Sequence, residues 1–258
     1  MKQGFVETRN YTKFMEGMTA LEARGSVECR LVVVDGLPGL GKTTILHRWA
    51  AMEDCIYLRA KTEWSAYWMM SELLIGLGVS DAEIPRGHEK RFRACIAALS
   101  ERLARAQTAR QQFAIVIDEA DHVSGKSALV DTIRDFTDLT EVPFVLVGMG
   151  RIRDNLTKHP QTASRISRYI RFEPAGIDDV QVFLDRKCAI PVAPDLASFV
   201  AQATRGFNRE ILEAIVSIER FGQRNAPAGP EGLTLREMAG EHLINDRKSG
   251  QAIMVPGR

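Results

Sequence analysis

The stretch VVVDGLPGLGKTTILHRW, residues 32–49, decides the fold. Its apolar start is typical of a buried strand, and its last residues have the composition of a helix. Between these two parts, residues 36–43 (GLPGLGKT) match G-x-x-x-x-G-K-[ST] in full. We therefore predict a strand, a glycine-rich turn and a helix in immediate succession, which is the structural context that this motif requires.

Such a turn binds the phosphates of a nucleoside triphosphate. Its glycines let backbone N–H groups converge on phosphate oxygens, and the positive end of the following helix faces the same charge. Lys42 would reach the β- and γ-phosphates, and the Thr43 hydroxyl would ligate Mg²⁺. The cofactors expected are ATP and Mg²⁺. The nucleotide-binding residues expected from the motif are Gly36, Leu37, Pro38, Gly39, Leu40, Gly41, Lys42, Thr43 and Thr44.

A second motif, FAIVIDEADH (113–122), ends an apolar strand on two carboxylates. Because the carboxyl ends of parallel strands share one edge of a sheet, Asp118 and Glu119 should lie beside the phosphate-binding turn. Asp118 would bind the nucleotide's Mg²⁺, largely through water, and Glu119 would polarise the attacking water. An Asp-Glu pair could also cap the next helix, but the turn upstream favours hydrolysis.

The remaining chain alternates short apolar runs with helical patterns. Strands are expected at 29–36, 54–60, 112–121, 142–150 and 168–174, and helices at 42–53, 65–77, 89–108, 126–138 and 151–158. The alternation predicts an α/β fold with an open parallel sheet covered on both faces. Beyond Pro174 only helices are expected, at 178–189, 194–204 and 208–222. We predict a nucleotide-binding core at 1–174, a helical domain at 175–246 and a disordered tail at 247–258.

Composition limits the partners and the compartment that we expect for the protein. A formal net charge of +1 over 258 residues excludes nucleic-acid binding by bulk charge, so such binding would need a local patch. The four cysteines, Cys29, Cys55, Cys95 and Cys188, form no C-x-x-C pair, which favours reduced thiols. No apolar run approaches the roughly 18 residues needed to span a bilayer. We expect a cytoplasmic protein without membrane contact.

The motifs in this order resemble an AAA+ ATPase. After the turn come IVIDEAD (115–121), FVLVGM (144–149), SRISRYIRF (164–172) and a helical segment with GFNRE (206–210). The resemblance implies a P-loop core with a parallel five-stranded sheet in the order 5-1-4-3-2, and a small C-terminal helical lid. Softer signals are ETRNYTKF (7–14), LIGLGV (74–79), DEADH (118–122) and VGMG (147–150). On these the chain is most similar to the transposition regulators MuB, TniB and TnsC, which share features with the Orc/Cdc6 branch.

The resemblance also implies roles for three arginines. Arg209 matches the sensor 2 arginine, which contacts the γ-phosphate of its own subunit. Arg165, with Arg168 as the second choice, matches the arginine finger given to a neighbouring subunit, a role that suits an always-charged fork. All three could instead be surface arginines. The sensor 1 position departs from the family, because 148–150 (GMG) replaces a polar side chain and so predicts slow hydrolysis.

A basic segment offers a DNA surface. Residues 86–112 hold seven lysines and arginines but only two glutamates, enough to neutralise several phosphates without reading sequence. Family position adds Lys61 and Thr62 as contacts to the DNA backbone. The expected DNA-binding residues are Lys61, Thr62, Lys90, Arg91 and Arg93. The alternative is an ordinary solvated helix face, since ACIAALSERLARA (94–106) also carries an apolar stripe.

The implied function is an ATP-dependent regulator of transposition. It would assemble as a ring or filament on double-stranded DNA, largely without sequence preference, and recruit a transposase, and hydrolysis would drive disassembly. Two alternatives stay open: a signalling NTPase that does not bind DNA, and a helicase loader of the DnaC or IstB type that prefers single strands. A nucleotide kinase fits the Asp118-Glu119 strand poorly.

Overall fold

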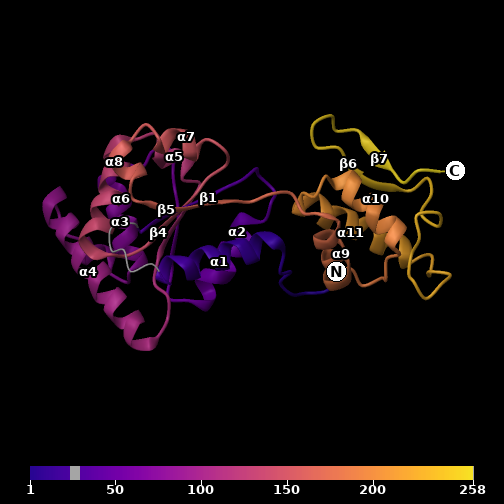
Figure 1. Ribbon diagram of the computed structural model, residues 1–258, viewed down its shortest axis with the longest axis horizontal. Coiled ribbons are helices and arrows are strands. Elements are labelled where there is room, and N and C mark those ends of the chain that lie inside the picture. The colour runs from indigo at the N-terminus through magenta and orange to yellow at the C-terminus, as the bar shows by residue number, and fades with distance from the viewer. Residues whose placement is uncertain (24–29, 258) are drawn as a thin grey trace. The chain divides into compact units, whose positions relative to one another are not determined.

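The chain forms two compact units in the computed structural model, which describes residues 1–23 and 30–257 (Figure 1). The core unit comprises residues 14–37 and 42–172, and the C-terminal unit comprises residues 1–13, 38–41 and 173–258. The division after residue 172 lies close to the expected boundary at 174. Residues 1–13, expected in the core domain, and the tip of the phosphate loop, 38–41, instead group with the C-terminal unit.

A five-stranded parallel sheet forms the centre of the core unit. Its strands are β1 (Leu31–Asp35), β2 (Ile56–Arg59), β3 (Ile115–Asp118), β4 (Phe144–Val147) and β5 (Ile166–Arg171). Their order is β2-β3-β4-β1-β5, which confirms the predicted order and the fold class. Strands β3 and β4 are buried throughout, because their valine and isoleucine side chains pack on both faces of the sheet.

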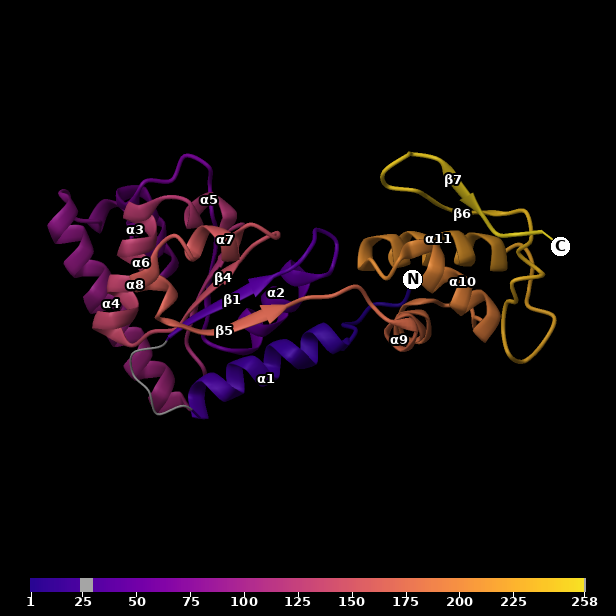
Figure 2. The same ribbon diagram turned by 45° about the horizontal axis from the view of Figure 1, so that its top comes forward.

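Helices cover both faces of this sheet (Figure 2). The core unit contains most of α1 (Arg9–Ala23), and α2 (Lys42–Met52), α3 (Ala66–Gly76), the 3₁₀ turn η1 (Asp81–Glu83), α4 (His88–Ala109), α5 (Asp121–Ser124), α6 (Ser127–Thr140), α7 (Ile152–Leu156) and α8 (Pro160–Ala163). Helices α3, α4 and α6 share one apolar cluster with the strands, including Leu73, Leu99 and Phe136. On the other side α1 and α2 lie together, with the Phe14 and Trp49 rings edge to face at 5.1 Å.

The C-terminal unit has its own apolar core. Its elements are α9 (Ile177–Lys187), α10 (Pro194–Thr204), α11 (Asn208–Gly222), β6 (His242–Asn245) and β7 (Ala252–Met254). The hairpin corrects two expectations, because strands do recur beyond Pro174 and residues 247–257 are not a disordered tail. Strand β7 pairs antiparallel with β6, and Val255 is only 1% exposed. Two strands of three and four residues are too short to produce a readable alternation in sequence.

The first thirteen residues are held by the C-terminal unit through polar contacts. Asn10 exchanges two hydrogen bonds with the backbone of Glu173, at 2.8 and 3.0 Å. The Arg9 side chain pairs with Asp179 at 3.0 Å. These contacts explain why a segment at the start of the sequence groups with residues beyond 173.

The described cysteines have free thiols of low reactivity. Cys55, Cys95 and Cys188 form no disulfide in the described part of the chain, while Cys29 lies outside the described residues. Burial raises the pKa of Cys55 and of Cys95 to about 12, so both stay protonated at neutral pH. None of the helices in 1–23 and 30–257 combines the length and the hydropathy that crossing a bilayer requires.

Candidate nucleotide-binding and catalytic site

The phosphate loop joins β1 to α2 at the carboxyl edge of the sheet. Asp35 ends the strand and accepts the Gly36 N–H at 2.8 Å, and α2 begins at Lys42. Gly39 and Gly41 have φ values of +92° and +82°, which only glycine adopts without strain. The motif therefore has the strand, turn and helix context that the sequence predicts.

Lys42 is buried inside this loop. Its Nζ donates to the carbonyls of Gly36 at 2.5 Å and Leu37 at 3.0 Å, and the residue is 7% exposed. Burial lowers the pKa of Lys42, and the nearby carboxylates of Asp118 and Asp35 counteract that shift. A phosphate oxygen is a stronger partner for an ammonium than a neutral carbonyl. The lysine is thus already at the loop that would hold the phosphates.

Thr43 and Asp118 converge as the expected metal pair. The Thr43 hydroxyl donates to Asp118 Oδ2 at 2.9 Å, and the Tyr57 hydroxyl also donates to this oxygen. Asp118 is 7% exposed, and burial raises the pKa of Tyr57, so the phenol remains a donor. A hydroxyl and a carboxylate side by side form the oxygen donor set that Mg²⁺ takes next to a phosphate. These two residues fit the ion expected from the sequence.

Glu119 has a strained backbone and a charged partner. Its φ is +55°, in the left-handed region that non-glycine residues rarely adopt. The conformation is held by its own N–H, which donates to Asp118 Oδ1 at 2.8 Å, and by the Ala120 N–H, which donates to the Val147 carbonyl at 2.7 Å. Its carboxylate pairs with Arg59 at 2.6 Å. The candidate base is therefore fixed beside Asp118 and linked to the end of β2.

The end of β4 explains the missing sensor 1 side chain. A Cβ on Gly148 would lie 2.6 Å from Ile152 Cβ, so this position accepts only glycine. A polar group comes instead from Asp121, whose Oδ2 accepts the Met149 N–H at 2.5 Å. The other oxygen, Asp121 Oδ1, is buried and lacks a partner among the described residues. The Asp121 carboxylate therefore lies beside the end of β4, and sequence reasoning overlooked it.

The three arginines expected in catalysis lie in different places. Arg165 directly precedes β5 and donates to Asp138 at 2.9 Å, and Arg168 lies within β5. Because Leu31 is opposite Ile166 in a parallel pair, Arg165 lies at the amino edge of the sheet, about 15 Å from the loop edge by strand rise. It is therefore not positioned for its own nucleotide. Arg209 lies exposed in the first turn of α11, in the C-terminal unit.

The first turn of α11 contacts the tip of the phosphate loop within the C-terminal unit. Asn208 Nδ2 donates to the Leu40 carbonyl at 3.3 Å. A Cβ on Gly41 would lie 2.5 Å from the same nitrogen. This contact places the turn that carries Arg209 beside residues 38–41, the tip of the loop.

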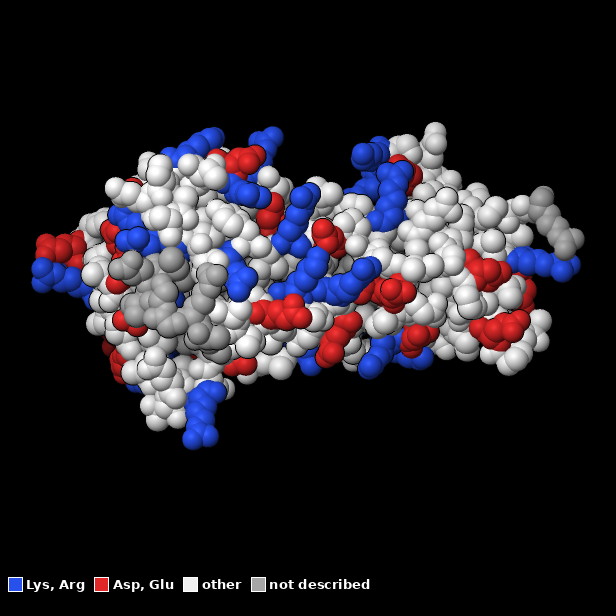
Figure 3. All heavy atoms as spheres, in the orientation of Figure 1, with Lys and Arg blue, Asp and Glu red and all other residues white. Residues whose placement is uncertain are grey.

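The expected DNA surface is less cationic than the sequence indicates. Arg91 is 8% exposed, donates to the Pro85 and Tyr67 carbonyls and stacks on the Tyr67 ring at 3.6 Å, so it fastens α4 to α3. We therefore withdraw Arg91 as a DNA contact. Arg93 is exposed and pairs with Glu89 at 2.7 Å, and Lys90 is exposed. Both signs of charge are interspersed on the face shown in Figure 3.

The other two expected DNA contacts lie just beyond β2. Lys61 is exposed, pairs with Glu72 and lies over the Trp68 ring at 5.1 Å. Thr62 Oγ1 lies 3.4 Å from His122 Nδ1. These residues follow Arg59, the partner of Glu119, by two and three positions.

The comparisons with known proteins decide the family. A family model described as AAA domain matches residues 25–156, just over half of the chain. The chain belongs to the AAA domain family. Membership confirms the predicted enzyme class, an ATPase of the AAA type. No curated protein matches the chain in sequence.

Solved structures share the fold of this AAA protein. Cdc6p from Pyrobaculum aerophilum is 18% identical with a TM-score of 0.58, covering 86% of this chain and 65% of that one. The Aeropyrum pernix ORC1 protein in complex with DNA is 18% identical with a TM-score of 0.55, covering 83% and 59%. The ORC2 protein of the same organism, in ADPNP and ADP complexes, is 12% identical with a TM-score of 0.63, covering 86% and 66%. The chain spans less than two thirds of each of these structures.

Two further residues of the site, besides Asp121, escaped sequence reasoning. Arg59 and Tyr57 come from β2, which the sequence identifies only as an apolar run. Their signal is positional, because β2 neighbours β3 in the sheet and its last residues must face the Asp118-Glu119 pair. In the register, Arg59 is directly opposite Asp118.

Proposed function

We propose that this AAA protein binds ATP and Mg²⁺ at residues 36–44 and hydrolyses ATP in response to double-stranded DNA. Lys42 would hold the phosphates, Thr43 and Asp118 the Mg²⁺, and Glu119 would accept the proton of the attacking water. The metal would supply charge neutralisation of the phosphates. Further, we propose that the ATP-bound form assembles on the duplex and recruits a transposase, and that hydrolysis releases the assembly.

The observation that carries this proposal is the ion pair between Glu119 and Arg59. A cation on a carboxylate occupies an oxygen that would otherwise hold the attacking water. Arg59 is the last residue of β2, two positions before Lys61, an expected contact to DNA phosphates. A duplex bound at Lys61 and Thr62 would compete for the exposed Arg59 and so free the base. The candidate catalytic group and the candidate DNA surface are thus joined by one short segment.

Assembly is proposed from the position of Arg165. An arginine at the amino edge of the sheet reaches a nucleotide only if that nucleotide belongs to a second copy of the chain. ATP bound to one subunit would then be contacted by Arg209 of the same subunit and by Arg165 or Arg168 of its neighbour. The resemblance to MuB, TniB and TnsC supports a transposase as the partner, and the match to an ORC1 protein in complex with DNA supports DNA binding.

Hydrolysis of ATP should rise when duplex DNA of arbitrary sequence is added. The expected result is a severalfold increase in steady-state phosphate release, together with ATP-dependent particles on the duplex in electron micrographs. Because the contacts are to phosphates, the stimulation should fall steeply between low and physiological salt. Rates unchanged by any nucleic acid would contradict the proposal and favour a signalling NTPase, whereas stimulation by single strands alone would favour a helicase loader.

Replacing Arg59 with Ala should uncouple hydrolysis from DNA. Because an exposed ion pair is weak, we expect basal hydrolysis to rise only a few fold without DNA and to gain little when DNA is added. The control is Arg224→Ala, which removes another exposed arginine with a glutamate partner, Glu241, outside the core unit. A DNA response of normal size in the Arg59 variant would disprove the coupling.

A further inference from the structure

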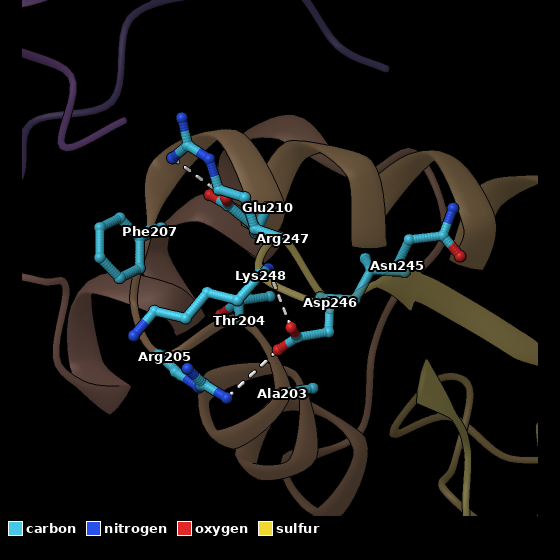
Figure 4. Close-up of a pocket in the computed structure, with 10 residues that line it drawn as sticks. Ala203, Thr204, Arg205, Phe207, Glu210, Asn245, Asp246, Arg247 and Lys248 are labelled. Atoms are coloured by element: carbon cyan, nitrogen blue, oxygen red, sulfur yellow. Dashed lines mark hydrogen bonds and ion pairs between the residues drawn. The ribbon is translucent and has the colours of Figure 1, made fainter. Parts of the chain in front are cut away.

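An arginine outside every recognised motif reaches the tip of the phosphate loop. Within the C-terminal unit, Arg247 Nη1 donates to the Pro38 carbonyl at 3.3 Å and lies 3.4 Å from Glu210 Oε1 (Figure 4). A Cβ added to Gly39 would lie 3.1 Å from the same nitrogen. The guanidinium therefore hydrogen-bonds one residue of the segment that is expected to bind phosphate and lies close to the next.

Glu210 is a buried carboxylate beside the same segment. Its side chain is 9% exposed, and Oε2 lacks a hydrogen-bond partner among the described residues. This unpartnered oxygen would lie 3.8 Å from a Cβ on Gly39, so it faces the loop backbone. A buried carboxylate is costly unless it is paired. Here its charge would also repel the phosphates that the loop binds.

The turn between β6 and β7 that presents Arg247 is well fixed. Asp246 Oδ1 accepts the N–H groups of Lys248 at 2.9 Å and Ser249 at 2.8 Å, and its other oxygen pairs with Arg205 at 3.2 Å. The hydrogen bonds from Ser249 lower the pKa of Asp246, so this carboxylate stays charged at neutral pH. Figure 4 shows the Arg247 side chain leaving the turn toward Glu210, at a cavity of about 90 Å³. The turn therefore holds the Arg247 guanidinium at the tip of the phosphate loop.

We propose that Arg247 is a positioning residue for nucleoside polyphosphates, which neutralises Glu210 and holds the loop tip at Pro38 so that the tip accepts phosphate charge. The inference rests on the proposed ATP binding and adds a requirement to it. Arg247 acts through the loop and through a carboxylate, whereas Arg209 is the arginine expected to touch the phosphate itself.

The test is the affinity of the full chain for ATP, ADP and AMP, measured by titration calorimetry for the parent and its variants. Arg247→Ala should weaken ATP binding by about tenfold, because it leaves the Glu210 charge uncompensated beside the loop that binds the phosphates. The loss should be smaller for ADP and smallest for AMP, since it follows phosphate charge. A loss of equal size for all three nucleotides would overturn the proposal.

Glu210→Gln separates an electrostatic role from a structural one. This variant removes the repelling charge, so it should bind ATP at least as tightly as the parent. The double variant Arg247→Ala/Glu210→Gln should return to within about threefold of the parent, since the two residues act as a coupled pair. If the pair only holds the fold together, both single variants and the double variant would bind ATP more weakly, which would overturn the proposal.

Lys248→Ala is the matched control. It removes a cation from the same turn, and the Lys248 ammonium forms no hydrogen bond or ion pair with the loop among the described residues. Its ATP affinity should equal that of the parent, and a loss as large as that of Arg247→Ala would overturn the specific role. Thermal unfolding measured without nucleotide shows which variants fold. If Arg247→Ala does not fold, the test depends on Glu210→Gln, and weaker ATP binding by that variant would refute the inference. A parent that binds no ATP would refute the proposed function instead.

Discussion

Glu119→Gln should abolish turnover while ATP stays bound. A positioned base contributes about 100- to 10,000-fold to a rate, so we expect steady-state phosphate release to fall by about that factor. Glutamine keeps the size of the side chain, and the Glu119 N–H still donates to Asp118 Oδ1, which preserves the metal pair. ATP affinity should therefore be close to that of the parent, and assemblies on duplex DNA should persist because they are no longer released.

Glu141→Gln is the control for this substitution. Glu141 has nearly the same left-handed backbone, with φ of +60° against +55° for Glu119, and it is exposed at the end of α6. Glu141→Gln makes the same chemical change in the same backbone conformation, so it shows any effect that comes from backbone strain alone. Parental phosphate release by Glu119→Gln would show that another group activates the water, and Asp121 would be the next candidate.

Lys42→Ala should remove ATP binding and assembly together. Hydrogen bonds to charged groups contribute about 1.5–3 kcal/mol, so losing the ammonium should weaken ATP binding by about 10- to 100-fold. Without bound ATP there is no γ-phosphate for a neighbouring subunit to contact, and particles on DNA should disappear. Calorimetric titration with ATP and electron microscopy measure the two effects.

Lys126→Ala is the matched control for Lys42→Ala. The Lys126 ammonium also donates to two backbone carbonyls, those of Thr62 and Trp64, but it does not lie in the phosphate loop. Its ATP affinity should be unchanged. Tight ATP binding by a folded Lys42→Ala variant would contradict the assignment of the loop.

The sequence predicts the core unit well because its signals are local. An apolar run followed by GLPGLGKT leaves few alternatives to a strand, a phosphate loop and a helix, and the resemblance to AAA+ ATPases then implies the order of the strands. The Thr43–Asp118 contact follows from the same logic, since Thr43 follows the loop after β1 and Asp118 ends β3, and both strands end at the same edge of the sheet. The parts that depend on neighbours in space are harder to predict.

Arg91 and Arg59 illustrate that limit. Both are arginines next to apolar residues, yet Arg91 is buried against backbone carbonyls and Arg59 is exposed beside the candidate base. The difference comes from residues far along the chain, Tyr67 in one case and Glu119 in the other. The hairpin that carries Arg247 was missed for a related reason, because seven strand residues bury too little apolar surface to stand out in sequence.

The crowding at Gly148 limits how this protein can change over evolutionary time. Any side chain there would collide with Ile152, so a polar residue cannot be acquired through one substitution. Because the nearest atom is Ile152 Cβ itself, a route to that arrangement must remove this Cβ or move the backbone at 152, and either change would first loosen the packing. The two positions are therefore epistatic, and selection for faster turnover would have to cross a less stable intermediate sequence.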